Sequence, residues 1–266
     1  MTDHDAHITW TEQSRAGGGP GPGVRVFRHG SATAVASPGL SGRDRLAVAG
    51  DPSDALPLVR DALREVGPTY RPFGDARLID ALVRGTPGLL PGGAGFLWME
   101  TATAPGAATG VRWLDRDGER AAGALIDLCF PDSYARPGRP GVRRWAGVYG
   151  GEGGAGGVHA SAGDGGIGGV YAGAGGGGAG GGAAAVVAVA ADAWSAARCG
   201  FLAGVVTHPR ARGRGLAAAV SAFVVDALVR RHGRAALMVD ADNAPAIAVY
   251  ERAGMRGRRF GAAVVG

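Results

Sequence analysis

The chain has 266 residues, of which 51 are glycine, and a formal net charge of +5 at pH 7. Hydrophobic residues make up 46% and charged residues 19%, a balance that is typical of folded globular proteins and excludes wholesale disorder. The glycines have no three-residue period, which excludes collagen, and no apolar run reaches the ~18 residues of a membrane span. The chain has only two cysteines, which predicts no disulfide framework. Its first residues are acidic and lack an apolar stretch, which predicts no secretory leader. Together these features predict a cytoplasmic location.

The first half of the chain is predicted to contain strands followed by helices. Apolar runs predict strands at residues 24–28, 32–36, 45–49 and 96–100. Cap residues and helical spacing predict helices over residues 55–66 and 76–84. A polar stretch over residues 101–110 follows as a linker. We therefore predict an N-terminal α+β domain over residues 1–105 and a second domain over residues 106–266.

The second half alternates strands and helices. Strands are expected at 111–114, 142–149, 184–191, 201–207 and 235–239, with a final strand at 264–265. Helices are expected at 119–129, at 216–231, where Gly233 ends the helix, and from the cap Asn243 to 253. Residues 150–182 hold 19 glycines among 33 residues and too few apolar side chains to pack. They predict a flexible insertion, which would be an enlarged turn if the strands at 142–149 and 184–191 form a hairpin.

The basic residues point to an anionic ligand near the C-terminus. All 28 are arginines, and residues 201–266 hold ten of them against four acids. Within that region the apolar strand 201–207 leads into a turn containing Gly213 and Gly215, which opens directly into a long helix. The first turn of a helix offers unpaired N–H groups and a positive dipole, and glycine lets a phosphate approach the backbone closely. This arrangement predicts a pyrophosphate site.

Other phosphate loops fit less well. The loop of nucleotide hydrolases requires a lysine, and the chain has none. The dinucleotide fingerprint has alanine, Ala218, at its third glycine position, which is allowed. Its acidic residue should lie ~20 residues on, and Asp240 lies too far along the chain.

Two motifs in order resemble the GNAT N-acetyltransferase superfamily. The first is Arg210-Ala-Arg-Gly213-Arg-Gly215, which matches its acyl-CoA motif. The second runs from Leu237 to Met255 and contains Asp240, Asn243 and Tyr250 before Gly254, with methionine where phenylalanine is more usual. Gly213 and Gly215 alone would suit an ordinary turn, and the second motif favours cofactor binding. The resemblance covers residues 111–266.

The resemblance implies an α+β fold with a mixed, mostly antiparallel sheet flanked by helices, acetyl-CoA as co-substrate and no metal. It implies that the pantetheine arm pairs with the backbone of Val205, Val206 and Thr207. The pyrophosphate would bind the amides of six consecutive residues, Arg212, Gly213, Arg214, Gly215, Leu216 and Ala217. Asn243 would contact the cofactor as well as cap its helix.

Tyr250 would be the general acid that protonates the departing thiolate. It lies seven residues after Asn243, about two turns along the same helix face. The base is left open: Asp240 or Asp242 through water, Asp192, Glu251, or solvent. His208 suits a turn residue better than a base. The arginines at 256, 258 and 259 form either a solvated face or a contact with the CoA ribose phosphate.

The N-terminal half echoes the element order of the second half and suggests a smaller, degenerate GNAT-like copy. Ala49-Gly50-Asp51-Pro52 stands where a phosphate loop would be. An unrelated α+β cap is the alternative. Overall the sequence predicts transfer of acetyl from acetyl-CoA to a small-molecule primary amine by direct attack, with no nucleic-acid or membrane partner, as a monomer or homodimer. A protein-amine acetyltransferase and a non-catalytic acyl-CoA sensor are the alternatives.

Overall fold

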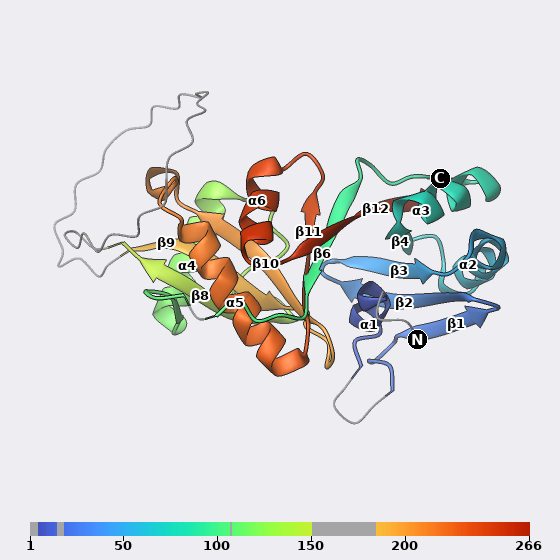
Figure 1. Cartoon of the computed structure of the whole chain (residues 1–266). Helices are drawn as coiled ribbons and strands as arrows, with labels where there is room; N and C mark the ends of the chain where they lie inside the picture. The colour runs from blue at the N-terminus through green and yellow to red at the C-terminus, as the bar shows by residue number, and fades with distance from the viewer. Residues whose placement is uncertain (1–4, 15–18, 107, 151–184) are drawn as a thin grey trace.

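The computed structural model describes residues 5–14, 19–106, 108–150 and 185–266 (Figure 1). Within these residues, twelve strands form one continuous sheet in the order β1-β2-β3-β4-β12-β6-β11-β10-β9-β8-β7, and β5 pairs with β12 beside this path. The β3–β4 and β10–β11 pairs are parallel and the remaining pairs are antiparallel. The predicted fold class, a mostly antiparallel sheet flanked by helices, is therefore confirmed.

The N-terminal half contributes three helices and six strands among the described residues. The helices are α1 (Ala6–Thr11), α2 (Pro52–Val66) and α3 (Ala76–Gly85). The strands are β1 (Arg25–His29), β2 (Ala32–Leu40), β3 (Arg43–Ala49), β4 (Arg71–Asp75), β5 (Leu89–Pro91) and β6 (Phe96–Thr101).

The C-terminal half contributes the remaining elements. Its helices are α4 (Arg116–Cys129), the 3-10 turn η1 (Pro209–Ala211), α5 (Leu216–His232) and α6 (Ala244–Arg252). Its strands are β7 (Arg112–Trp113), β8 (Val142–Tyr149), β9 (Val186–Ala193), β10 (Gly200–Thr207), β11 (Ala235–Asp240) and β12 (Arg256–Val265). Strands β8 and β9 form the predicted antiparallel pair. The predicted insertion 150–182 lies outside the described residues apart from Gly150.

The two halves share one order of elements and exchange their last long strands. Each half has three antiparallel strands, then a helix, a parallel strand, a second helix and a final strand. This order runs from β1 to β6, apart from the short β5, and again from β8 to β12. The final strand of each half crosses over: β6 pairs with β11, and β12 pairs with β4. Figure 1 shows β12 entering the N-terminal half, where the C-terminus lies beside α3. The domain division after residue 105 stays a prediction.

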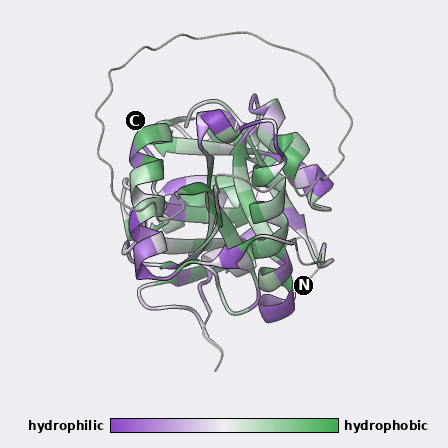
Figure 2. Cartoon of the chain, turned by 90° about the vertical axis from the view of Figure 1, so that its left-hand side faces the viewer, coloured by the Kyte–Doolittle hydropathy of each residue, from purple (hydrophilic) through white to green (hydrophobic). Residues whose placement is uncertain are grey.

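Helices cover both faces of the sheet because alternate strand residues point to opposite sides. Ala34, Leu46 and Val48 pack with α2 and α3, whereas Val35 and Ala47 pack with α1. In the other half α5 and α4 likewise pack on opposite faces. Figure 2 shows hydrophobic strands in the interior and hydrophilic residues mainly around the periphery.

The sequence-based expectation missed α1, β4, β5 and η1 and placed the start of β12 too late. Helix α1 was not predicted, yet its Trp10 is fully buried and stacks on Phe201 of β10 with ring centroids 4.4 Å apart. Strand β4 was missed because Pro72 and Gly74 are poor strand formers, although the neighbouring strands bury both. Strand β12 begins at Arg256 rather than at residue 264, because its first residues pair with β6 although they are polar and mostly exposed. No helix of the described chain is long and apolar enough to span a membrane.

Candidate active site at the split between β10 and β11

The parallel strands β10 and β11 pair only where they begin. Gly200 is in register with Ala235 and Phe201 with Ala236, and the pairing ends there. The residues that follow, Leu202 to Val205 on β10 and Leu237 to Asp240 on β11, line a cleft of about 830 Å³. On the side away from β9, this part of β10 thus lies beside a cavity rather than beside a neighbouring strand.

A bulge at Gly204 bends β10 at this point. Its register with β9 shifts between Ala203 and Val206, and Gly204 has a left-handed φ of 62°. A Cβ at this position would lie 2.5 Å from the Trp145 ring, so no other residue fits without displacing the tryptophan. The bulge directs the Val205 backbone into the opening between the strands.

The glycine-rich turn before α5 has the geometry that a phosphate loop requires. Gly213 and Gly215 have φ angles of 76° and 73°, and a Cβ added to either would meet no atom within 4 Å. The first backbone bond closing α5 runs from the amide of Ala219 to the carbonyl of Gly215. The preceding amides, from Leu216 to Ala218, lie at the positive end of the helix dipole, where an anion is stabilised.

A second cavity, of about 370 Å³, lies between β10, the start of α5 and α6. It is lined by six residues of the predicted cofactor site, Val205, Val206, Thr207, Arg212, Ala217 and Asn243. Gly213, Arg214, Gly215 and Leu216 form the turn beside it and do not line it. Five residues line both this cavity and the cleft, namely Phe130, Val205, Asn243, Ala246 and Tyr250.

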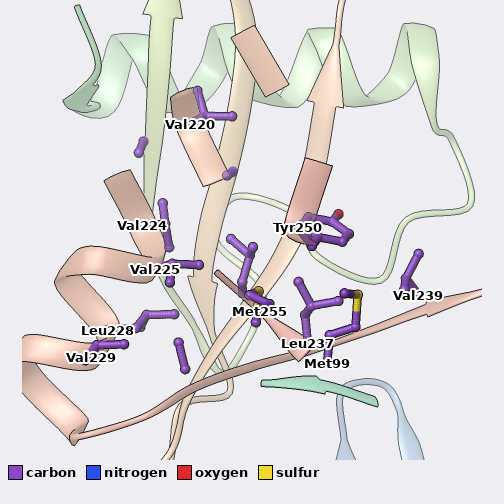
Figure 3. Close-up of a cluster of buried hydrophobic side chains, with 14 of the residues drawn as sticks. Met99, Val220, Val224, Val225, Leu228, Val229, Leu237, Val239, Tyr250 and Met255 are labelled. Carbon is purple, nitrogen blue, oxygen red and sulfur yellow. The ribbon is translucent and has the colours of Figure 1, made fainter. Parts of the chain in front are cut away.

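Tyr250 lies at the junction of the two cavities. Its side chain extends from α6 into a hydrophobic cluster with Leu237 and Met255, and only 8% of it is exposed (Figure 3). Burial raises the pKa of the phenol to about 12, so that it stays protonated at neutral pH. Within the described residues its hydroxyl has no hydrogen-bond partner, which leaves the proton available to a ligand.

The four candidate bases occupy different surroundings. Asp240 and Asp242 are exposed and line the cleft. Asp192 is buried elsewhere, where it accepts a 2.6 Å hydrogen bond from the Ser195 hydroxyl and pairs with Arg144. Glu251 is exposed and lines neither cavity. Only the two aspartates after β11 share a cavity with Tyr250.

Two residues of the motifs hold local turns. The side-chain oxygen of Asn243 accepts a 3.2 Å hydrogen bond from the Ala246 amide and so caps α6. His208 accepts a hydrogen bond from the Arg210 amide through Nδ1, 3.2 Å away, and caps η1. His208 is therefore a turn residue, as predicted.

Of the β12 arginines and the two cysteines, only Cys129 lines either cavity of this site. Arg258 lines a different cavity, of about 260 Å³, with His7 and Asp75. Burial raises the pKa of the Cys199 thiol to about 12, so this cysteine stays protonated. Cys129 lines the smaller cavity from the end of α4. Within the described residues, no group of three histidine, cysteine or acidic side chains could hold a metal ion.

Sequence reasoning missed the part of the cleft that the N-terminal half supplies. Arg43, Arg45, Arg71 and Phe73 line the cleft from β3 and β4. They lie far from both motifs in the sequence. The one signal was the alternation of Arg43 and Arg45, which places two arginines on one face of a strand.

Comparisons with known proteins agree with this architecture. Residues 182–261 match the family model described as FR47-like protein. A search of curated proteins found no match. A GCN5-related N-acetyltransferase from Kribbella flavida superimposes with a TM-score of 0.53 at 16% identity, over 98% of this chain and 93% of that chain.

Two further solved structures are similar. A Drosophila protein has a TM-score of 0.51 at 11% identity, over 88% of this chain and 73% of its own. A GCN5-related N-acetyltransferase from Sphaerobacter thermophilus has a TM-score of 0.48 at 16% identity, over 88% and 76%. At these identities, the likeness to the Kribbella and Drosophila structures shows the fold alone. Both superpositions cover the N-terminal and the C-terminal half of this chain.

Proposed function

Because this chain is a GNAT-superfamily protein by its fold and by its FR47-like match, we propose that it transfers acetyl from acetyl-CoA to a primary amine. The observation that carries the proposal is the position of Tyr250. It lies where a cavity beside the glycine-rich turn meets a cleft that opens to the N-terminal half. A donor and an acceptor entering from these two cavities would meet at its hydroxyl.

The residues around the smaller cavity fit acetyl-CoA. The open space over Gly213 and Gly215 leaves room for a pyrophosphate on the first-turn amides of α5. Arg212 and Arg214 add positive charge. The part of β10 that β11 does not pair with, from Val205 to Thr207, would hold the pantetheine amides on the side away from β9, as a neighbouring strand would. Asn243, which also lines the cavity, would add a polar contact.

When bound, acetyl-CoA supplies an acyl group on a thiol leaving group. The amine nitrogen forms a bond to the acyl carbon, and the carbon–sulfur bond breaks. Tyr250 donates its proton to the sulfur as the charge develops, and burial ensures that the phenol carries this proton at neutral pH. Asp240 or Asp242 accepts the proton that the amine loses, through a water molecule in the cleft. No covalent intermediate on the enzyme is required.

The dimensions of the cleft favour a small-molecule acceptor. It is bounded by sheet strands on one side and by residues 130–134 on the other, where Tyr134 accepts hydrogen bonds from Arg43 of the N-terminal half. This contact partly closes the cleft against an extended polypeptide. A protein amine as acceptor and a non-catalytic acyl-CoA sensor are the alternative functions. We further propose a cytoplasmic enzyme without nucleic-acid or membrane partners.

Two measurements on the full-length protein test the proposal. Calorimetry with acetyl-CoA should give saturable binding at one site. A thiol-release assay over a set of small amines should give turnover above the rate without enzyme. Binding without turnover on any amine or peptide would favour the sensor, and the absence of binding would refute the assignment.

A further inference from the structure

Three arginines line the cleft from strands of the N-terminal half, whereas Tyr250 lines it from α6. Arg43 and Arg45 lie on β3 and Arg71 lies on β4, and all three line the cleft. Arg45 and Arg71 are directly in register on these parallel strands, so that two positive side chains lie opposite each other. Like charges that lie opposite each other on neighbouring strands are destabilising unless a counter-charge lies nearby. This placement therefore calls for an anion.

Arg45 is the most enclosed of the three. Its guanidinium lies 5.6 Å from the ring centroids of Trp10 and Phe73. Its Nε and Nη2 donate hydrogen bonds to the Ser41 hydroxyl, at 2.9 and 2.6 Å, and Nε also donates to the Leu40 carbonyl. All of these acceptors are uncharged. In the described part of the chain no carboxylate lies within ion-pair distance, so the positive charge has no counter-ion.

The electrostatics agree with this geometry. Burial, together with the nearby charges of Arg43 and Arg71, lowers the pKa of Arg45 from 12.5 to about 10. The side chain is still charged at neutral pH, although its surroundings disfavour the charge. A buried charge without a partner costs free energy, and a bound anion would remove that cost.

The other end of the cleft carries the opposite charge. Asp240 and Asp242 line it beside Tyr250, whereas Asp132 lines the cleft from the loop after α4, two residues before the Tyr134 that contacts Arg43. Strands β4 and β11 are separated by β12 and β6, which places their backbones about 14 Å apart at a strand spacing of ~4.8 Å. The cleft is therefore acidic where an amine would react and basic at a distance from that point.

We propose that the acceptor amine carries a second, anionic group, a carboxylate or a phosphate, at the far end of its skeleton, and that Arg45 and Arg71 bind this group. The proposal rests on the proposed acetyltransferase function and specifies its substrate class. Amines with an adjacent carboxylate, such as simple α-amino acids, are too short to reach both ends. An ω-amino acid, a short peptide or a phosphorylated amino sugar carries its amine and its anionic group farther apart.

The test uses matched pairs of amines that differ only in the anionic group. Triglycine is compared with triglycine amide, 6-aminohexanoate with 6-aminohexanamide, and glucosamine 6-phosphate with glucosamine. Each compound is titrated by calorimetry into the full-length protein saturated with CoA, so that binding is measured without turnover. The first two pairs report on a carboxylate and the third on a phosphate. We expect at least one member with the anionic group to bind at least tenfold more tightly than its partner without that group.

Two variants locate the preference. Arg71→Gln changes an exposed residue. It should remove the preference for the compound with the anionic group, while the affinity for the compound without that group stays unchanged. Arg45→Gln should do the same, and thermal unfolding checks that it folds. Arg231→Gln, on the exposed end of α5 and outside the cleft, is the matched control and should retain the preference. In turnover assays of the Arg71 and Arg45 variants, the weaker binding of the compound with the anionic group should raise KM and leave kcat unchanged.

The outcomes separate this inference from the proposed function. Equal binding within every pair, or no binding of any compound, would overturn the inference, and so would a preference that survives Arg71→Gln and Arg45→Gln. Acetyl-CoA binding and thiol release are measured on the same protein. If these are present while the pairs do not differ, the acetyltransferase assignment stands and only the substrate class is wrong.

Discussion

Phe260 of the C-terminal strand pairs with Asp75, which belongs to the N-terminal half of the chain. On its other side Phe260 pairs with Phe96 of β6, and β6 in turn pairs with β11. Each half of the sheet is thus completed by a strand from the other. The exchange also brings Arg45 and Arg71 into the same cleft as Tyr250.

This exchange predicts that neither half folds alone. A fragment of residues 106–266 would lack β6, which would leave β11 and β12 without the strand that lies between them. It would also expose the buried side chains Phe260 and Phe201, which pack against Trp98 and Trp10. We expect this fragment to be insoluble or to lack a cooperative thermal transition in circular dichroism. Co-expression with residues 1–105 should restore a soluble complex.

A cooperative transition in the isolated 106–266 fragment, at a temperature near that of the full chain, would contradict the prediction. It would mean that the second half is an independent domain and that the exchanged strands contribute little to its stability.

Gly215 and Gly233 offer a matched test of the phosphate turn. They flank α5 with similar left-handed φ angles of 73° and 78°, and at both a Cβ would meet no protein atom within 4 Å. Valine at either position should cost a similar strain, roughly 1–2 kcal/mol. Only at Gly215 would the side chain occupy the space over the first-turn amides. We expect Gly215→Val to weaken acetyl-CoA binding by at least tenfold in calorimetry, and Gly233→Val to leave it unchanged.

Thermal unfolding of both variants reports the shared strain. If Gly215→Val binds acetyl-CoA as tightly as Gly233→Val does, the pyrophosphate does not lie on this turn.

Tyr250→Phe tests the proton donor. Removing the hydroxyl keeps the ring in its hydrophobic cluster, and proton transfer by a positioned group contributes about 10²–10⁴-fold to a rate. We expect kcat to fall by at least tenfold while acetyl-CoA affinity stays the same. Because burial raises the pKa of the phenol to about 12, the wild-type rate should not decline through loss of this proton below pH 11. An unchanged kcat would remove Tyr250 from the mechanism.

The sequence predicted the parts of the site that depend on contiguous residues. Gly213, Gly215, Asn243 and Tyr250 lie in two motifs whose spacing defines a turn and a helix, and the structure places them near the split between β10 and β11. The basic end of the cleft could not be predicted in this way. Arg71 reaches it only because β4 pairs with β3 and with β12, and the partner of a strand is set by tertiary packing rather than by local pattern.

His7 provides a prediction for stability against pH. It is fully buried on α1, its Nε2 donates a 3.1 Å hydrogen bond to the Val48 carbonyl, and its Nδ1 has no partner among the described residues. Burial lowers its pKa from 6.5 to about 4. The unfolded chain therefore binds a proton at this residue below pH 6.5, whereas the folded chain does so only near pH 4. Stability must fall as the pH decreases through this range.

The expected loss from His7 is about 3 kcal/mol between pH 6.5 and pH 4, at 1.36 kcal/mol per pKa unit. Urea unfolding at a series of pH values measures it. His7→Phe should be less stable than the wild type at pH 7, because the hydrogen bond to Val48 is lost, but its stability should depend less on pH. The exposed His29 is the control, and His29→Gln should retain the wild-type dependence. Parallel pH profiles for His7→Phe and the wild type would show that His7 is not buried as a neutral group.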